Sequence, residues 1–255
     1  MDKKIIWSII IAGVVVIAGA AIWGIWSLWK EFKDPKEEHK LKEELNEAVE
    51  KASADAVDAF ITTKSDAFIG DKAKLDAVKT GATITIAEAD ITRRKTELKN
   101  KYDAGDQAKI DNVDKAGGSK PTEALDKAKA TATTKIDEKA KEIARKLISQ
   151  KIKEKVSKKN EEAAKSATAD DISNLVKKGS SADNAAKDKI IVKAKDAAGK
   201  KVNDIISDTV WSEIERAVQT EGNEPLKSQV AEINKNKDTI IDDAILTVAG
   251  LPKKG

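Results

Sequence analysis

Residues 5–29 read IIWSIIIAGVVVIAGAAIWGIWSLW, and no charged side chain interrupts them. At about 1.5 Å per residue, a helix of this length spans roughly 37 Å, which is enough to cross a bilayer core of about 30 Å. Trp7 lies near one end of the run, and Trp23, Trp26 and Trp29 lie near the other. Because tryptophan prefers the boundary between lipid and water, the run predicts an N-terminal transmembrane helix with these four residues at the membrane interfaces.

The alternative interpretation of this run is a cleaved secretory signal peptide, because Ala18-Gly19-Ala20 resembles a small-residue cleavage site. However, the apolar run continues for nine residues beyond Ala20. A secretory apolar region is about 7–15 residues long and ends before its cleavage site. We therefore expect an uncleaved, single-pass membrane anchor.

Small residues gather on one face of the predicted membrane helix, at Gly13, Ala20, Gly24 and Ser27. Small residues four apart allow two membrane helices to approach closely, so we expect this face to serve in membrane helix packing. Two lysines precede the apolar run, and five follow it between residues 30 and 42. The positive-inside rule therefore favours the cytoplasmic side for the large C-terminal region.

The charge pattern of the chain argues against nucleic acid as a partner. Its 255 residues include 47 lysines and arginines and 44 aspartates and glutamates, which leaves a net charge of only +3. Acids and bases are interleaved, and this pattern favours solubility over polyanion binding. Only four of the basic residues are arginine, the side chain that best recognises phosphates and base edges.

The sequence offers little material for catalysis. Cysteine is absent, and the single histidine, His39, lies within a run of charged residues. Disulfides and thiolate chemistry are therefore excluded, and a zinc site has almost no ligands to draw on. Residues 117–120, GGSK, lack the spacing of a phosphate-binding loop. We expect no enzyme activity, no catalytic, cofactor-binding or metal-ligating residues, and no small-molecule substrate.

The region after residue 35 is predicted to be helical. Its first helix begins near Lys36 and carries an alanine-rich apolar face with a period near 3.6 residues. That face comprises Leu41, Leu45, Ala48, Ala52, Ala56 and Ala59. Glycines then separate short segments, and two of these, residues 70–78 and 105–113, match at six of nine positions and suggest an internal repeat. Residues 81–87 are strand-like, but we expect most of 82–102 to be helical.

A longer amphipathic helix is predicted from about residue 121 to residue 160, because Pro121 suits a first helical turn and an apolar face follows. Its stability would come from packing that face against a partner. A short helix is expected to begin at Thr168 and to end at Gly179. A further helix is expected to open at Ser180 and Ser181 and to end around Trp211 to Val218. The predicted helix-packing interface comprises Ile143, Leu147, Ile148, Ile152, Ile190, Ile205, Ile206 and Trp211. We expect Trp211 to pack within the bundle, the alternatives being a contact with another subunit or exposure to water.

Together these patterns predict an all-α protein, in which an N-terminal transmembrane helix precedes an elongated multi-helix bundle or coiled-coil-like region. We expect an anchor at residues 1–34, a first helical region at 35–118 and a second at 119–255. Helices restart at Asn223, and Gly250 with Pro252 stops the last one.

The predicted function is structural: a membrane-anchored scaffolding subunit of a larger assembly, such as a virion, a surface layer or a membrane apparatus. Its partners would be the lipid bilayer together with copies of itself or other subunits. The alternative is a membrane-remodelling or lipid-binding protein with amphipathic helices. Against that alternative, the predicted apolar faces after residue 35 are rich in alanine and poor in tryptophan and phenylalanine.

Overall fold

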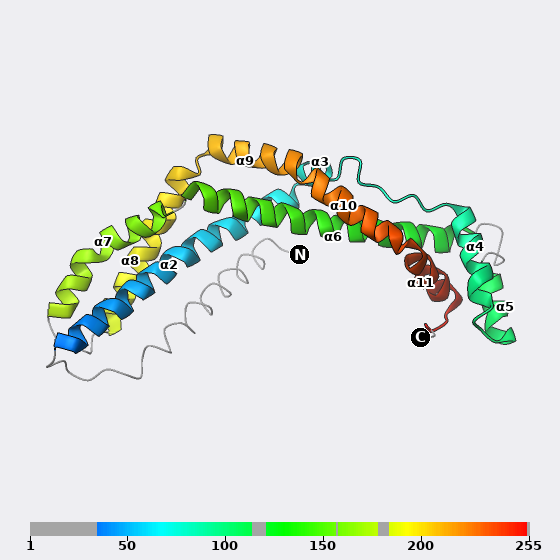
Figure 1. Ribbon diagram of the computed structural model, residues 1–255, viewed down its shortest axis with the longest axis horizontal. Helices are drawn as coiled ribbons and strands as arrows, with labels where there is room; N and C mark the ends of the chain where they lie inside the picture. The colour runs from blue at the N-terminus through cyan, green and yellow to red at the C-terminus, as the bar shows by residue number, and fades with distance from the viewer. Residues whose placement is uncertain (1–34, 114–120, 157, 178–183, 254–255) are drawn as a thin grey trace. The chain divides into compact units, whose positions relative to one another are not determined.

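The computed structural model describes residues 35–113, 121–156, 158–177 and 184–253 (Figure 1). Within these ranges the regular structure is entirely α-helical and contains no strand, which confirms the all-α prediction. The predicted transmembrane helix at residues 5–29, with its interface tryptophans and its small-residue face, lies outside the described residues. Among the residues that are described, no helix is both long enough and apolar enough to cross a membrane.

The helices follow one another along the chain with short connections. Their bounds are α2 Pro35–Gly70, α3 Lys72–Val78, α4 Glu88–Lys99, α5 Ala104–Asn112, α6 Pro121–Val156, α7 Lys159–Lys177, α8 Asn184–Ile205, α9 Asp208–Glu221, α10 Asn223–Lys235 and α11 Lys237–Ala249. Side-chain caps account for some of these ends. The carboxylate of Asp71 accepts the Ala73 and Lys74 N–H groups at 3.0 and 3.3 Å, so it caps the start of α3. Gly250 adopts a left-handed conformation with φ of 69°, which ends α11.

Two compact units make up the described chain. The first holds the described residues of Met1–Lys64 and Ser149–Trp211, and the second holds those of Ser65–Ile148 and Ser212–Gly255. This differs from the sequence-based division at residue 118, because each unit combines a segment from before that point with a segment from after it. Helices far apart in sequence share a core in each unit, and composition along the chain carries no signal for such long-range packing.

The first unit is built on α7 and α8, which lie side by side and run in opposite directions (Figure 1). Part of α2 packs against this pair through the same apolar cluster. The cluster comprises Leu41, Leu45, Val49, Ala52, Ala56, Ala164, Ile172, Leu175, Ile190, Ala194 and Ala198. Alanine at so many of these positions lets the helix backbones approach closely, at the cost of less buried apolar area per residue.

The second unit gathers α4, α5, part of α6 and α11 around larger aliphatic side chains. Its cluster comprises Ile86, Ile91, Leu98, Tyr102, Ile110, Val113, Ala124, Leu125, Ala128, Ala132, Ile240, Ile241, Ala244, Ile245, Leu246 and Leu251. The hydroxyl of Tyr102 donates a hydrogen bond to the carbonyl of Pro252 at 2.9 Å, so the one tyrosine of the chain satisfies its polar end while its ring lies in the core.

Buried side chains recur at every fourth residue along the long helices. In α6 they include Ala128, Ala132, Ile136, Ala140, Ala144, Ile148, Ile152 and Val156. With 3.6 residues per turn, each such step rotates the buried face by about 40° in the right-handed sense. A left-handed coiled coil needs a mean spacing of 3.5 residues, so this spacing is not that of a left-handed coiled coil. It also differs from the period near 3.6 predicted for α2, where Ala48 and Ala59 are only half-buried.

Most of residues 82–102 is helical, as predicted, and residues 82–87 of the strand-like stretch lie outside any helix. The helical part of residues 82–102 is α4, which begins at Glu88. Ala82 and Ile86 are buried, Ile84 packs against the second unit's core, and Thr83 and Thr85 are exposed. The alternation of threonine and isoleucine suits an extended chain on the surface of a core, and here it outweighs the helical character of the flanking residues.

Two helix boundaries also differ from the prediction. The helix expected to open at Ser180 and Ser181 and to end around Trp211 to Val218 is broken at Ile206–Ser207, so that α9 begins at Asp208. The Ser207 carbonyl accepts the Trp211 N–H at 2.8 Å, as expected of the residue that precedes a helix. Thr168, the predicted start of a helix, lies inside α7, where its hydroxyl donates to the Ala164 carbonyl at 2.9 Å.

Candidate functional site

The predicted packing residues fall into two groups by burial. Ile148, Ile152, Ile190 and Ile206 are buried, while Ile143, Leu147, Ile205 and Trp211 are half-buried. In α6 the difference follows from the four-residue spacing of the buried side chains, because Ala144 and Ile148 belong to that buried series. Leu147 lies beside the buried series rather than at its centre, so it is only half-buried.

Trp211 forms an aromatic and cationic cluster in the first unit. The Lys64 ammonium lies 5.0 Å from the centroid of the Trp211 ring and 5.5 Å from that of Phe60. A lysine over two aromatic faces is attracted by both ring quadrupoles, and each contact is worth about 0.5–1 kcal/mol at a partly exposed site. The half-buried indole therefore contacts α2 through the ammonium group of Lys64.

A buried polar pair lies within the first unit. The Asn160 amide donates to the Ser53 hydroxyl at 2.8 Å, and both residues are at least 94% buried. The Oδ1 atom of Asn160 has no hydrogen-bond partner among the described residues. A shallow hollow of about 300 Å³ adjoins the pair, with Asp58, Lys153 and Glu161 also in its lining. Polar groups buried in this way restrict which helix registers are compatible with the core.

Lys187 is a buried base in the same unit. Only 8% of this α8 residue is exposed. Burial lowers the pKa of Lys187 to about 8, an effect that the nearby carboxylates of Glu44 and Asp188 oppose. The ammonium form of Lys187 is thus less favourable in the folded chain than in water.

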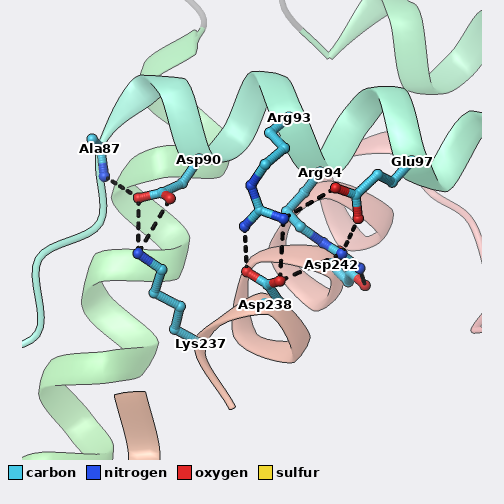
Figure 2. A network of polar contacts seen from close by, with 8 residues as sticks. All are labelled: Ala87, Asp90, Arg93, Arg94, Glu97, Lys237, Asp238 and Asp242. Carbon is cyan, nitrogen blue, oxygen red and sulfur yellow. Dashed lines mark hydrogen bonds and ion pairs between the residues drawn. The ribbon is translucent and has the colours of Figure 1, made fainter. Parts of the chain in front are cut away.

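The densest polar site is an ionic network between α4 and α11 in the second unit (Figure 2). The Arg93 guanidinium donates to both carboxylate oxygens of Asp238, at 2.6 and 3.2 Å. The neighbouring Arg94 donates through Nε to Asp242 at 2.7 Å and through Nη2 to the second oxygen of that carboxylate. Glu97 accepts from both arginines. Two of the four arginines of the chain therefore form bidentate pairs on one face of α11.

Asp90 extends the same network towards the start of α4. Its carboxylate accepts the Ala87 N–H at 3.0 Å and lies 3.2 Å from the Lys237 ammonium. The hydrogen bond from the Ala87 backbone, followed by the contact with Lys237, lowers the pKa of Asp90. Hydrogen bonding from Arg93 likewise lowers the pKa of Asp238. Both carboxylates are therefore held in the ionised form, which suits ion pairing and not proton transfer.

The sequence contained a partial signal for this network. Asp238 and Asp242 are four residues apart on α11, and Arg93 and Arg94 have Glu97 within the next turn. The pairing of the two helices joins positions 145 to 148 residues apart, however, and single-sequence periodicity does not reveal such contacts. No residue of the network was singled out from the sequence.

No group of three or more histidine, cysteine, aspartate or glutamate side chains is placed to hold a metal ion within the described ranges. The polar sites that are present join helices to one another. Comparison of the chain with protein-family models, with curated proteins and with solved structures finds no match.

Proposed function

We propose that this chain is a membrane-anchored structural or scaffolding subunit of a larger assembly, acting by helix packing and not by catalysis. Residues 5–29 form its single transmembrane helix, with Trp7, Trp23, Trp26 and Trp29 at the two interfaces. The helical region lies on the cytoplasmic side, as the lysines that follow the apolar run favour. The small-residue face at Gly13, Ala20, Gly24 and Ser27 brings copies together in the bilayer.

One observation carries the scaffolding role: the apolar faces of the described helices are turned towards one another. Each unit has its own buried cluster. Among the described residues, Val192 is the one large hydrophobic side chain that is exposed, at 58%. Helices that bind a bilayer surface present an apolar face to it. To act in that way, these helices would first have to open their own cores.

The charged outer surface also fits a scaffold. Ion pairs are frequent on this surface. Some lie within one helix, such as Lys139 with Glu142 at 2.8 Å, and others join two helices, such as Lys193 with Asp171 at 2.6 Å. Pairs exposed to this degree contribute little stability, typically about 0–1 kcal/mol each. Their value lies in specificity, because a surface of alternating signs accepts a partner only in a register that matches charges.

Alkaline carbonate extraction of membranes from expressing cells tests the anchor. The full-length chain is expected to stay in the membrane pellet, and a chain lacking residues 1–34 is expected in the supernatant. Cross-linking within the membrane then tests association, since Gly24→Ile places a branched side chain on the small-residue face and Gly19→Ile makes the same change away from that face. Loss of cross-linked dimer in the first variant alone supports the proposal. Release of the full-length chain by carbonate contradicts it.

A further inference from the structure

The first unit contains two series of buried side chains, each with a spacing of four residues. In α2 the series comprises Leu41, Leu45, Val49, Ser53, Val57 and Ile61. Along the end of α6 and through α7 it comprises Ile152, Val156, Asn160, Ala164, Thr168 and Ile172. Moving one series past the other by four residues replaces one small apolar side chain with another at most positions. The apolar pattern alone therefore specifies the register of these helices only weakly.

Three members of the two series are polar, and they differ in what they bond to. The Thr168 hydroxyl donates to the Ala164 carbonyl of its own helix at 2.9 Å, so this bond is kept wherever α7 lies along α2. The Asn160 amide instead donates to the Ser53 hydroxyl at 2.8 Å, from α7 to α2. This second hydrogen bond joins two helices, so it depends on their register.

The α2 helix runs antiparallel to the end of α6 and to α7. Before Ser53 in the sequence, Glu50 pairs with Lys165 at 2.5 Å. After Ser53, Asp58 pairs with Lys153 at 3.0 Å. The side chains of these two ion pairs are 41–61% exposed, so each pair stabilises the register only slightly. The buried hydrogen bond between them is the stronger determinant of register.

A shift of four residues in either direction breaks that hydrogen bond. The Asn160 amide then lies opposite Val49 or Val57, and a buried amide without a partner is strongly unfavourable. Even in the observed register, the Oδ1 atom of Asn160 has no hydrogen-bond partner among the described residues. Since a partly satisfied polar pair is less stable than apolar packing, this pair favours one register and lowers stability.

The α7–α8 hairpin is joined to the rest of the chain by two helix breaks. The α7 helix begins at Lys159, shortly after α6 ends at Val156, and α9 begins at Asp208, shortly after α8 ends at Ile205. Both breaks lie at the same end of the antiparallel hairpin, and Asn160 is in the first turn of α7 there. A shift of the hairpin along α2 by one four-residue step is a movement of about 6 Å, and it needs each break to move by about one turn.

We propose that the buried pair of Ser53 and Asn160 is a register lock, which holds the α7–α8 hairpin in one of several four-residue registers along α2. Without the pair, the hairpin populates a shifted register as well. A single buried polar contact that selects one helix register at the expense of stability is the best-attested use of such groups. This inference concerns the first unit alone, and it holds whether or not the chain is a membrane-anchored scaffold.

The test measures the position of the hairpin in the full-length chain in detergent micelles. Because the chain has no cysteine, Lys51→Cys in α2 and Asn174→Cys in α7, both at exposed positions, introduce its only two sites for spin labels. Double electron–electron resonance then measures the distance between the labels. The otherwise unaltered chain is expected to give one distance. Ser53→Ala combined with Asn160→Leu is expected to add a second distance, shifted by up to about 6 Å, and to raise the melting temperature.

Three controls separate the lock from other effects of buried polar groups. Thr168→Val removes a buried hydroxyl of the same series that bonds within its own helix, so one distance is expected. Ser53→Asn combined with Asn160→Ser exchanges the two partners and is expected to keep one distance. Labels at Asn174→Cys and Asp196→Cys, which both lie in the hairpin, are expected to give the same distance in every variant, because α7 and α8 move together.

A single, unshifted distance in the apolar double variant would overturn the proposal. Loss of helical structure or a lower melting temperature in that variant would also overturn it, because the pair would then be needed for stability. A second distance of equal weight in Thr168→Val would show that any buried polar group on this series restrains the hairpin, and the assignment to Ser53 and Asn160 would be wrong.

Discussion

The two units solve helix packing with different side chains. The first brings α2, α7 and α8 together through an alanine-rich cluster, and four polar residues, Ser53, Asn160, Thr168 and Lys187, are buried in the same unit. The second packs larger aliphatic residues and a tyrosine, and holds Arg93 and Arg94 in ion pairs between α4 and α11. Small apolar side chains give close helix contact with little hydrophobic stabilisation, whereas isoleucine and leucine give more stabilisation for each residue ordered. The first unit should therefore tolerate enlargement badly, and the second should tolerate truncation badly.

The largest expected effect is truncation in the second unit. Ile245 is fully buried in α11. Ile245→Ala removes buried methyl and methylene groups and leaves a cavity, at a cost of about 4 kcal/mol in the free energy of unfolding. Urea titration measures this cost, and Val192→Ala at the exposed position of α8 serves as a control, with an effect within about 0.5 kcal/mol. Equal losses for the two variants would show that α11 does not pack as described.

The next effect depends on pH and concerns Lys187 in the first unit. Because its pKa falls to about 8 on folding, the unfolded chain binds more protons than the folded chain between about pH 8 and 10.5. The unaltered chain should therefore gain stability as pH rises through this window, by at most about 3 kcal/mol. Lys187→Met should remove this gain and raise stability at pH 7. Denaturation of both chains at pH 7 and pH 10 measures the difference, and parallel pH profiles would refute the assignment.

Enlargement in the first unit is expected to cost somewhat less. Ala198 of α8 is fully buried in the alanine-rich cluster. Ala198→Leu inserts three extra carbons where helices approach closely, and overpacking of this kind costs about 2 kcal/mol. Ala185→Leu makes the same change at an exposed position of the same helix and is the control. Thermal unfolding with no loss at Ala198→Leu would indicate that the cluster has free space.

The smallest effect separates two glycines. A Cβ added at Gly199 in the middle of α8 meets nothing within 4 Å, whereas one at Gly222 lies 2.7 Å from the Val218 carbonyl oxygen and 3.0 Å from Val78 Cγ1. Gly199→Ala should stabilise the chain by about 1 kcal/mol, because alanine restricts the unfolded chain. Gly222→Ala should destabilise it by at least about 1 kcal/mol, because backbone atoms must move. Opposite shifts in melting temperature are the expected result.

The helix boundaries that depend on local capping and turn residues were predicted from the sequence. The long helix α6 begins at Pro121, α10 begins at Asn223 and Gly250 ends α11, all as expected from capping and turn preferences. The four-residue spacing of the buried side chains was not predicted. In α2, alanines such as Ala48 lie next to the buried residues, and they fit a period near 3.6 residues equally well. The β-branched run within residues 81–87 was recognised as strand-like, and residues 82–87 do lie outside any helix, but the sequence did not show that α4 begins only at Glu88.

The candidate sites were less accessible from sequence. The pairs of Arg93 with Asp238 and of Arg94 with Asp242 join α4 to α11 across most of the second unit's sequence, and only tertiary packing brings them together. The contact of Lys64 with Trp211 is of the same long-range kind. The two short segments with similar sequences show the limit of local similarity. Leu75 and Ile110 are both buried at the matching position, but Asp71 caps α3 whereas Asp103, and not the matching Asp106, caps α5.

Circular dichroism of residues 35–255, with and without anionic lipid vesicles, tests the central claim that these helices pack with one another and not with lipid. We predict a largely helical spectrum in buffer, a cooperative thermal transition, and no gain of helix when vesicles are added. We also expect that the chain does not sediment with the vesicles. A chain that is unfolded in buffer and becomes helical only on vesicles would contradict the scaffolding role and would establish the lipid-binding alternative.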